Sequence, residues 1–382
     1  MNAKELLRNI PVSVNNFYGD PTLQWGNTLN KLEQLALTGH SAPVGLITKG
    51  KLTSRHCNEL SQFSQLKLLV LVSISELPKG MEKASHDHRY RNIELLNKFN
   101  IPNIAYIRPL TPPYNSGEEV VNKIFRKISA AGAKAAMVCG FRGSDAMVSE
   151  FSPSEAIKWT LRVKQMTPEI WARVYRASQE NGIPLFMRTS CAVDYVLGHK
   201  STYNPYYNAP KLAKCVENNC PLIETCQPPS APKPGSLEFL RSLGYELEFQ
   251  YGTQNRQICN VEPHNRLECK SCCTTCFNLE NPRIFVYGDV QLGDLTFIRF
   301  ITGMISMQPG CRDTGGTNIG QVRLPSYQGI SNIICLNSWW AYATATVGEK
   351  CFDCKYCIEK HYATAHGAEI GFSPVRLLEK LL

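Results

Sequence analysis

The sequence predicts an α/β protein with a parallel sheet in its N-terminal half and a cysteine-rich α+β region after it. Two observations support this fold class. Strand-like apolar runs alternate with helical patterns between residues 10 and 188, and such alternation implies βαβ units with parallel strands. Most of the 16 cysteines and of the proline-rich loops lie beyond Ser190, which indicates a second kind of structure there.

Six short runs rich in Val, Ile, Leu, Met and Ala predict the strands, at residues 11–17, 44–48, 67–74, 101–107, 133–139 and 184–188. Segments with helical periodicity lie between them, at residues 28–37, 53–63, 89–99, 117–131 and 168–181. Right-handed crossovers then place the strands in one parallel sheet, either open or curled into a barrel. In both arrangements ligands bind at the carboxyl ends of the strands.

Length and composition indicate two or three globular domains. The 382 residues are 43% hydrophobic and 19% charged, so no large part has the composition of a disordered segment. From the change in cysteine and proline content we expect units at residues 1–190, 191–234 and 235–382. Segment 226–235 is the predicted linker, because its prolines exclude a helix or a central strand. An amphipathic helix is expected at 373–382.

The N-terminal segment lacks the uninterrupted apolar stretch of a signal peptide. Lys4, Glu5 and Arg8 lie within it, and no run of about 18 apolar residues occurs in the sequence. We therefore expect a cytoplasmic protein with no membrane partner, in which thiols stay reduced. The formal charge of +9 is compatible with a nucleic acid or anionic substrate and equally with an ordinary basic surface.

Polar and conformationally special residues follow the expected strands at their carboxyl ends. They are Gly19-Asp20-Pro21, Thr48-Lys49-Gly50, Ser73 with Ser75, Arg108-Pro109 and Cys139-Gly140. Any one of these segments can be an ordinary turn, since turns also favour Gly, Pro and Ser. Because the ends of parallel strands meet at one edge of the sheet, five such segments in succession predict a common pocket.

Thirteen cysteines fall into three groups, which we interpret as metal sites. The first group is Cys191, Cys215, Cys220 and Cys226. The second group is Cys259, Cys269, Cys272, Cys273 and Cys276. The third group is Cys335, Cys351, Cys354 and Cys357. Clustered thiolates in a reducing compartment bind iron–sulfur clusters or zinc.

The third group carries the most specific signal. Its CxxCxxC spacing at 351–357, with Cys335 upstream, is similar to the ligation of a [4Fe–4S] cluster in ferredoxins. Since no group has the paired CxxC spacing of a zinc ribbon, we expect two or three [4Fe–4S] clusters, with zinc as the alternative. His361 and His366 are either further ligands or surface histidines. The isolated cysteines are expected to be small buried side chains; they are Cys57, Cys139 and Cys311.

The N-terminal half, residues 2–190, resembles the radical S-adenosylmethionine superfamily, in particular its spore photoproduct lyase-like branch. Residues 2–7 are similar to the first helix of that branch, and Gly19-Asp20-Pro21 is similar to its GGEP motif. The resemblance implies a partial (β/α) TIM-like barrel that binds S-adenosylmethionine. It assigns the cosubstrate's amino group, carboxylate and ribose to Gly19, Asp20, Pro21, Thr48, Lys49, Ser73, Ser75 and Arg108. The C-terminal half is then similar to the auxiliary-cluster extensions of the family.

The chain departs from this family at its defining motif. The CxxxCxxC loop belongs about one strand before Gly19, where the sequence has no cysteine. Three explanations remain open. The loop resides on a missing or separate polypeptide; or the chain is circularly permuted, with 351–357 as its cluster loop; or the cofactor chemistry has been lost.

The resemblance favours an enzyme in which a 5′-deoxyadenosyl radical abstracts hydrogen from a substrate within the barrel. Asp20 and Lys49 then bind the amino and carboxylate ends of the cosubstrate by charge-assisted hydrogen bonds. The substrate is a nucleic acid or a peptide, and a ferredoxin or flavodoxin is the expected electron donor. The catalytic residues are not identified. The alternatives are a non-catalytic iron–sulfur subunit for electron transfer or scaffolding, and a zinc-binding protein.

Overall fold

The chain forms two sheets in a computed structural model. The structure describes residues 12–14, 20–82, 86–140, 166, 168–186, 189–198, 219–225, 230–250, 283–287, 298, 301–307 and 334–335. Among these residues, no helix is both long enough and apolar enough to cross a membrane.

The larger sheet has seven strands in the order β10-β1-β2-β3-β4-β5-β6. Their bounds are β1 (Val12–Val14), β2 (Pro43–Thr48), β3 (Lys67–Ile74), β4 (Asn103–Leu110), β5 (Ala136–Gly140), β6 (Leu185–Phe186) and β10 (Ile334–Cys335). Strands β1 to β6 are parallel and stand in chain order, while β10 is antiparallel to β1. The predicted α/β class with a parallel sheet is confirmed.

The central strands β2 and β3 are apolar along almost their whole length. Every residue of β2 is buried, and Lys67 is the one exposed residue of β3. A parallel strand that is covered on both faces has a continuous apolar sequence instead of an alternating one. For this reason the sequence predicted β3 with the bounds that it has in the structure.

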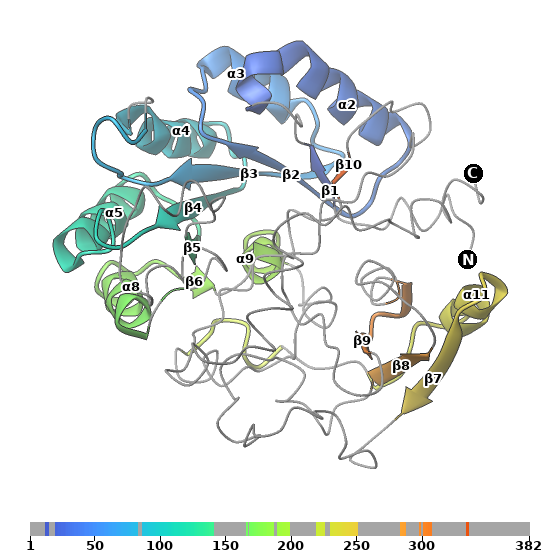
Figure 1. Cartoon of the computed structure of the whole chain (residues 1–382). Helices are drawn as coiled ribbons and strands as arrows, with labels where there is room; N and C mark the ends of the chain where they lie inside the picture. The colour runs from blue at the N-terminus through green and yellow to red at the C-terminus, as the bar shows by residue number, and fades with distance from the viewer. Residues whose placement is uncertain are drawn as a thin grey trace.

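Helices cover the outer face of the large sheet. They are η1 (Pro21–Gln24), α2 (Trp25–Leu37), α3 (Ser54–Ser61), α4 (Asp87–Lys98), α5 (Glu118–Ala130) and α8 (Pro168–Glu180). Figure 1 shows the α-helices of this set along the convex side of the curved sheet. Strands in chain order joined by right-handed crossovers place their connecting helices on one face. In α5 the residues that face the sheet follow the i, i+3, i+4, i+7 pattern: Val121, Ile124, Phe125 and Ile128.

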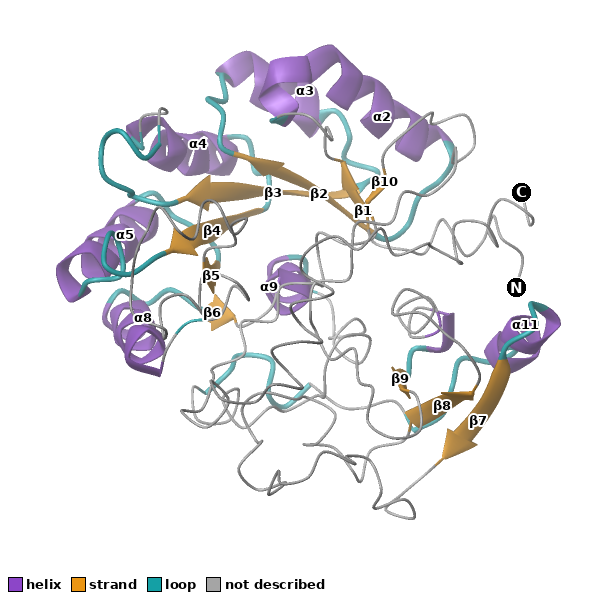
Figure 2. Ribbon diagram, in the orientation of Figure 1, coloured by secondary structure: helices purple, strands orange, loops and turns teal. Residues whose placement is uncertain are grey.

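Helix α9 (Thr189–Val196) lies on the other side of the sheet, as Figure 2 shows. It contacts β4, β5 and β6, and Cys191, Ala192 and Val193 are buried there. The domain boundary expected at residue 190 falls inside this helix. Residues on both sides of that position therefore pack with the N-terminal unit.

The smaller sheet belongs to the C-terminal part of the chain. It consists of β7 (Glu246–Gln250), β8 (Arg283–Tyr287) and β9 (Ile305–Met307) in that order. β7 is antiparallel to β8, and β8 is parallel to β9. Helix α11 (Ser236–Ser242) follows the proline-rich segment and contacts β7.

Some elements differ from their predicted bounds for local reasons. β4 begins at Asn103 and not at residue 101, because the backbone N–H of Ile101 donates to the carbonyl of Leu96 in the turn that ends α4. The short helix η1 was not predicted, although Asp20 as N-cap and Pro21 at the first position are a helix-start signal. The helix expected at 373–382 lies outside the described residues.

Candidate functional site

The carboxyl ends of β1 to β4 bring four of the predicted strand-end segments to one edge of the sheet. Asp20 follows β1, Thr48 ends β2 and Ser73 lies near the end of β3. Arg108 lies in β4, two residues beyond the Tyr106 that pairs with Ser73. We call the hydrogen-bonded group at this edge the carboxyl-edge site; it comprises Asp20, Thr48, Lys49, Gly50, Ser73, Ser75, Glu82, Arg89 and Arg108.

Asp20 accepts hydrogen bonds from its own chain on both carboxylate oxygens. Its Oδ1 accepts from the backbone N–H of Thr22 at 3.0 Å, the Thr22 hydroxyl at 2.7 Å and the Thr48 hydroxyl at 2.6 Å. Its Oδ2 accepts from the backbone N–H groups of Lys49 at 2.5 Å and Gly50 at 3.0 Å. A carboxylate offers about four lone-pair sites, so these donors fill its capacity. Asp20 thus caps η1 and fixes the loop that follows β2.

The environment of Asp20 keeps it ionised although neutral groups supply all these bonds. Burial raises the pKa of Asp20, but hydrogen bonds from Thr48, the Lys49 N–H and Thr22 together bring the pKa below its usual range. The approach of the loop requires glycine at position 50. A Cβ on Gly50 would lie 1.9 Å from the Thr22 hydroxyl oxygen and 2.8 Å from Asp20 Oδ1.

Glu82 is the second carboxylate of the site, and cationic side chains bind it. Lys49 Nζ lies 3.0 Å and Arg89 Nη2 lies 2.7 Å from its Oε1. Arg89 Nη1 donates to Glu82 Oε2 and to Ser75 Oγ, both at 3.1 Å, and the Ser75 hydroxyl also donates to Glu82. His86 Nδ1 is 3.9 Å from Oε2.

The Glu82–Arg89 pair is largely shielded from solvent. The Arg89 side chain is fully buried and that of Glu82 is 12% exposed. Burial raises the pKa of Glu82, but hydrogen bonds from Arg89, Ser75 and Lys49 lower it to about 2. Sequence reasoning named neither residue. A signal was present, because Arg89, Ile93 and Leu96 share one helix face, and a charge on an apolar face requires a buried partner.

Arg108 connects the ends of β3 and β4. Its Nε donates to Ser73 Oγ at 3.3 Å, and its Cζ lies 4.2 Å from the centroid of the Tyr106 ring. Asn115 fixes the same strand ends, since its Nδ2 donates to the carbonyl of Ser75 and, at 2.7 Å, to that of Pro109. The guanidinium is therefore positioned by an aromatic ring and a hydroxyl.

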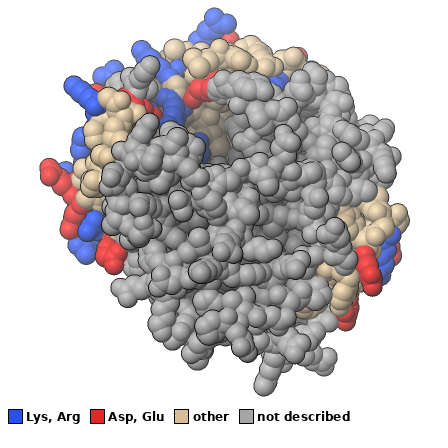
Figure 3. Space-filling model, in the orientation of Figure 1, with Lys and Arg blue, Asp and Glu red and all other residues tan. Residues whose placement is uncertain are grey.

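The carboxyl-edge site has an excess of positive charge. The cations Lys49, Arg89 and Arg108 face the carboxylates Asp20 and Glu82. Lys49 is the accessible member, with 46% of its side chain exposed. Figure 3 shows basic and acidic side chains beside a hollow on the viewed face. A partly buried edge with net positive charge favours an anionic group on a ligand.

The predicted cofactor-binding residues lie largely within this site. The structure brings together Asp20, Lys49, Ser73, Ser75 and Arg108. Gly19 lies outside the described residues, and Pro21 is buried as the first residue of η1. The contacts expected with S-adenosylmethionine stay predictions. For Asp20, a contact with the amino group requires the exchange of one of its present hydrogen bonds.

Most cysteines predicted as metal ligands lie outside the described residues. These are Cys215, Cys226, Cys259, Cys269, Cys272, Cys273, Cys276, Cys351, Cys354 and Cys357. Cys191 is buried in α9, Cys220 is half-buried, and Cys335 lies in β10 opposite Ser13 of β1. Within the described ranges, no three His, Cys, Asp or Glu side chains gather as a metal site.

Two isolated cysteines behave as the sequence predicted. Cys57 and Cys139 are both buried, and burial raises the pKa of Cys57 to about 11. Such a thiol stays protonated at neutral pH and packs as a small apolar side chain. Cys311, His361 and His366 lie outside the described residues.

Comparisons with known proteins add little to the geometry. No protein-family model and no curated protein matches the chain. Among solved structures, the chain is similar to a GH5-4 broad specificity endoglucanase from Clostridium longisporum, with 14% sequence identity and a TM-score of 0.23. That similarity covers 48% of this chain and 77% of the endoglucanase chain, and it supports no conclusion about activity.

Proposed function

We propose that this chain is a radical S-adenosylmethionine-like iron–sulfur enzyme whose carboxyl-edge site binds S-adenosylmethionine. The proposal includes the finer fold, a partial (β/α) TIM-like barrel followed by a cysteine-rich cluster region. One observation carries it. Six parallel strands stand in chain order, as in such a barrel, and residues from four consecutive strand ends meet at the edge where barrels bind ligands.

The charge of the site fits the methionine end of the cosubstrate. Lys49 and Arg108 are cations suited to a carboxylate, and the Ser73 hydroxyl is a partner for a ribose oxygen. Lys49 can exchange Glu82 for a ligand carboxylate, because Arg89 continues to neutralise Glu82. Asp20 then acts as a positioning residue, since its hydrogen bonds to the loop determine where Lys49 lies.

The pairing of β10 with β1 supports a cluster formed by the third cysteine group. The backbone of Cys335 lies opposite Ser13, beside the strand that leads to Asp20. In the family that the chain resembles, the strand next to this one carries the cluster loop. This arrangement favours a permuted chain, with the cluster bound by Cys335, Cys351, Cys354 and Cys357. When bound, a reduced [4Fe–4S] cluster supplies the electron that cleaves S-adenosylmethionine.

The other cysteine groups complete the proposal. They bind auxiliary clusters in the cytoplasm, a ferredoxin or flavodoxin donates electrons, and the substrate is a nucleic acid or a peptide. The domain units at 191–234 and 235–382 then form the auxiliary-cluster region.

Anaerobic reconstitution tests the proposal. Iron and sulfide are counted per chain, and 5′-deoxyadenosine is measured after addition of reductant and S-adenosylmethionine. We expect two or three [4Fe–4S] clusters and reductant-dependent 5′-deoxyadenosine. Replacement of Cys354 by alanine should remove one cluster and the product together. Stoichiometric zinc in place of iron would overturn the proposal.

Binding of S-adenosylmethionine is tested separately by equilibrium dialysis. The Arg108→Ala variant should bind about tenfold more weakly, because a charge-assisted hydrogen bond is lost. Arg126→Ala is the matched control, since Arg126 is exposed on α5, away from the site. Equal affinity of the two variants would refute the assignment of the edge.

A non-catalytic iron–sulfur subunit is the second candidate, and one observation favours it. The carboxylate of Asp20 and the ammonium of Lys49 both have partners within the chain, as expected of an edge that binds no cosubstrate. Clusters without 5′-deoxyadenosine, and no measurable binding of S-adenosylmethionine, would decide for the subunit.

A further inference from the structure

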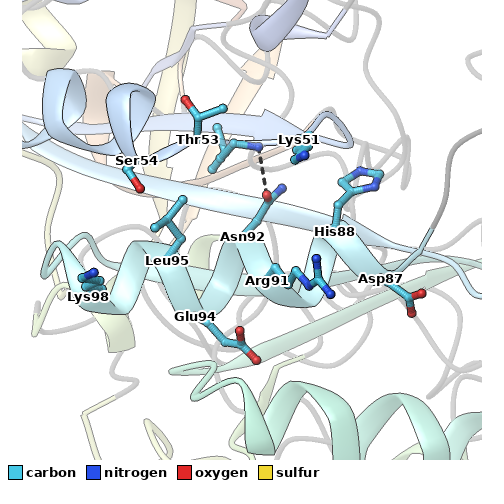
Figure 4. Close-up of a pocket in the computed structure, with 11 residues that line it drawn as sticks. Lys51, Thr53, Ser54, Asp87, His88, Arg91, Asn92, Glu94, Leu95 and Lys98 are labelled. Atoms are coloured by element: carbon cyan, nitrogen blue, oxygen red, sulfur yellow. Dashed lines mark hydrogen bonds between the residues drawn. The ribbon is translucent and has the colours of Figure 1, made fainter.

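A surface pocket of about 860 Å³ lies between helices α3 and α4, outside the carboxyl-edge site. This volume is within the usual range for small-molecule sites, roughly 300–1,000 Å³. The pocket is lined by Lys51, Leu52, Thr53, Ser54, Asp87, His88, Arg91, Asn92, Glu94, Leu95 and Lys98, most of which Figure 4 labels. The loop after β2 and the start of α3 form one wall, and α4 forms the other.

Three cations of the pocket have no acidic partner. In the part of the chain that the structure describes, Lys51, Arg91 and Lys98 take part in no salt bridge and no side-chain hydrogen bond. Other described cations do have carboxylate partners; Lys49 contacts Glu82, and Lys127 contacts Glu76. The unpaired cations come from two elements, the loop and α4.

The acidic residues of the pocket do not cancel this charge. The carboxylate of Asp87 lies 3.6 Å from Lys127, which is not part of the pocket. Glu94 is exposed, and Figure 4 shows both carboxylates directed away from Thr53 and Ser54 in that view. The wall nearest the start of α3 therefore carries net positive charge.

The polar groups beside the cations are donors or can become donors. His88 Nε2 lies 2.8 Å from the carbonyl oxygen of Lys49. A carbonyl only accepts, so Nε2 carries a proton, and protonation of the ring would make Nδ1 a further donor. Asn92 is buried and fully engaged, since it accepts from the Leu52 N–H and donates to the Gly50 carbonyl. The floor between these groups is apolar, with Leu52 and Leu95.

We propose that this pocket binds a phosphate-bearing small molecule. A phosphate group needs several cationic and N–H donors around a concave surface, and Arg91, Lys51 and the His88 ring supply them. The apolar floor accommodates the carbon skeleton of the ligand. The proposal does not rest on the function proposed above, because none of these side chains belongs to the carboxyl-edge site.

Isothermal titration calorimetry with inorganic pyrophosphate tests the proposal on the full chain at low ionic strength. Arg91→Ala and Lys51→Ala should each weaken binding about tenfold, since each removes a charge-assisted contact. Two matched controls, Arg126→Ala and Lys134→Ala, remove exposed cations elsewhere on the surface. All four side chains are exposed, so the variants are expected to fold, and circular dichroism verifies this.

A second pair of probes tests the chemical class of the ligand. Glucose 6-phosphate should bind, and glucose should not. Several outcomes would overturn the proposal: no binding of pyrophosphate by the wild-type chain, equal affinity of pocket variants and controls, or binding of glucose as tight as that of its phosphate. Loss of binding with Arg108→Ala but not with Arg91→Ala would assign the anion to the carboxyl-edge site and would also refute it. Binding of a single-stranded oligonucleotide without binding of pyrophosphate would refute the small-molecule class.

Discussion

Replacement of Asp20 by asparagine should loosen the loop after β2 without altering the shape of the side chain. An amide has one acceptor oxygen and one NH₂ donor. If the oxygen takes the place of Oδ1, it keeps the bonds from Thr22 and Thr48. The NH₂ group then faces the backbone N–H groups of Lys49 and Gly50, donor against donor. The flipped amide loses the other set of bonds, so asparagine is poorer in either orientation.

The magnitude follows from the two N–H groups that lose their acceptor. A buried donor without a partner costs about 1–3 kcal/mol. Because this loop is only partly buried and water can reach part of it, we take the lower end, about 2 kcal/mol in total. That free energy corresponds to a roughly 30-fold increase in the local opening equilibrium.

Amide hydrogen exchange with mass spectrometry measures this opening directly. Peptides that cover residues 48–53 should exchange roughly 30-fold faster in the Asp20→Asn variant. Peptides from β3 and α5 should be unchanged. The control is Glu33→Gln, the same chemical change at an exposed position of α2, which should leave exchange of the loop as in the wild type.

A second variant tests the same contact from the other side. Gly50→Ala places a methyl group 1.9 Å from the Thr22 hydroxyl oxygen, so the loop must move away from Asp20. Exchange of residues 48–53 should increase in this variant as well. If neither substitution changed their exchange, the hydrogen bonds of Asp20 would not be what fixes the loop, and the reasoning would be wrong.

Three further predictions concern other groups. Glu82→Gln leaves the buried Arg89 without its counter-charge and should lower the free energy of unfolding by about 3 kcal/mol, seen as a reduced thermal midpoint that Glu94→Gln does not reproduce. Burial, with a smaller contribution from Lys67, lowers the pKa of His40 to about 4 from an ordinary value of 6.5; a group with a depressed pKa stabilises the fold above its unfolded value, so this contribution should be lost as the pH falls from 6.5 towards 4, and thermal midpoints should drop less over that range in His40→Gln than in the wild type. Cys57 and Cys139 should resist iodoacetamide at pH 8 until denaturant is added, because both are buried; mass spectrometry locates the modified thiols, and labelling in the folded protein would contradict this.

The sheet could be predicted from sequence because its signal is local. β3 and the helix α5 carry uninterrupted or periodic apolar patterns that each determine one element by itself. The order of the strands also followed, since short crossovers leave consecutive parallel strands as neighbours. The position of Asp20, Thr48, Ser73 and Arg108 at one edge is a consequence of that order.

The hydrogen-bond partners within the site could not be predicted in the same way. Glu82 and Arg89 lie in different segments, and only the packing of α4 against the sheet shows that the Arg89 side chain is buried. The use of Asp20 as a helix cap and loop anchor depends on backbone N–H groups about 30 residues away, at Lys49 and Gly50. Backbone donors carry no sequence identity, so no residue pattern shows them.

The two carboxylates of the carboxyl-edge site are bound in opposite ways, and this allows the edge to exchange a ligand without losing its shape. Asp20 accepts only from hydroxyls and backbone N–H groups, so its hold on the loop does not depend on any mobile cation. Glu82 is bound by the buried Arg89 and by the half-exposed Lys49. An incoming anion can take Lys49 while Arg89 still neutralises Glu82. Were Lys49 the partner of Asp20 instead, each binding event would release the loop that positions the ammonium.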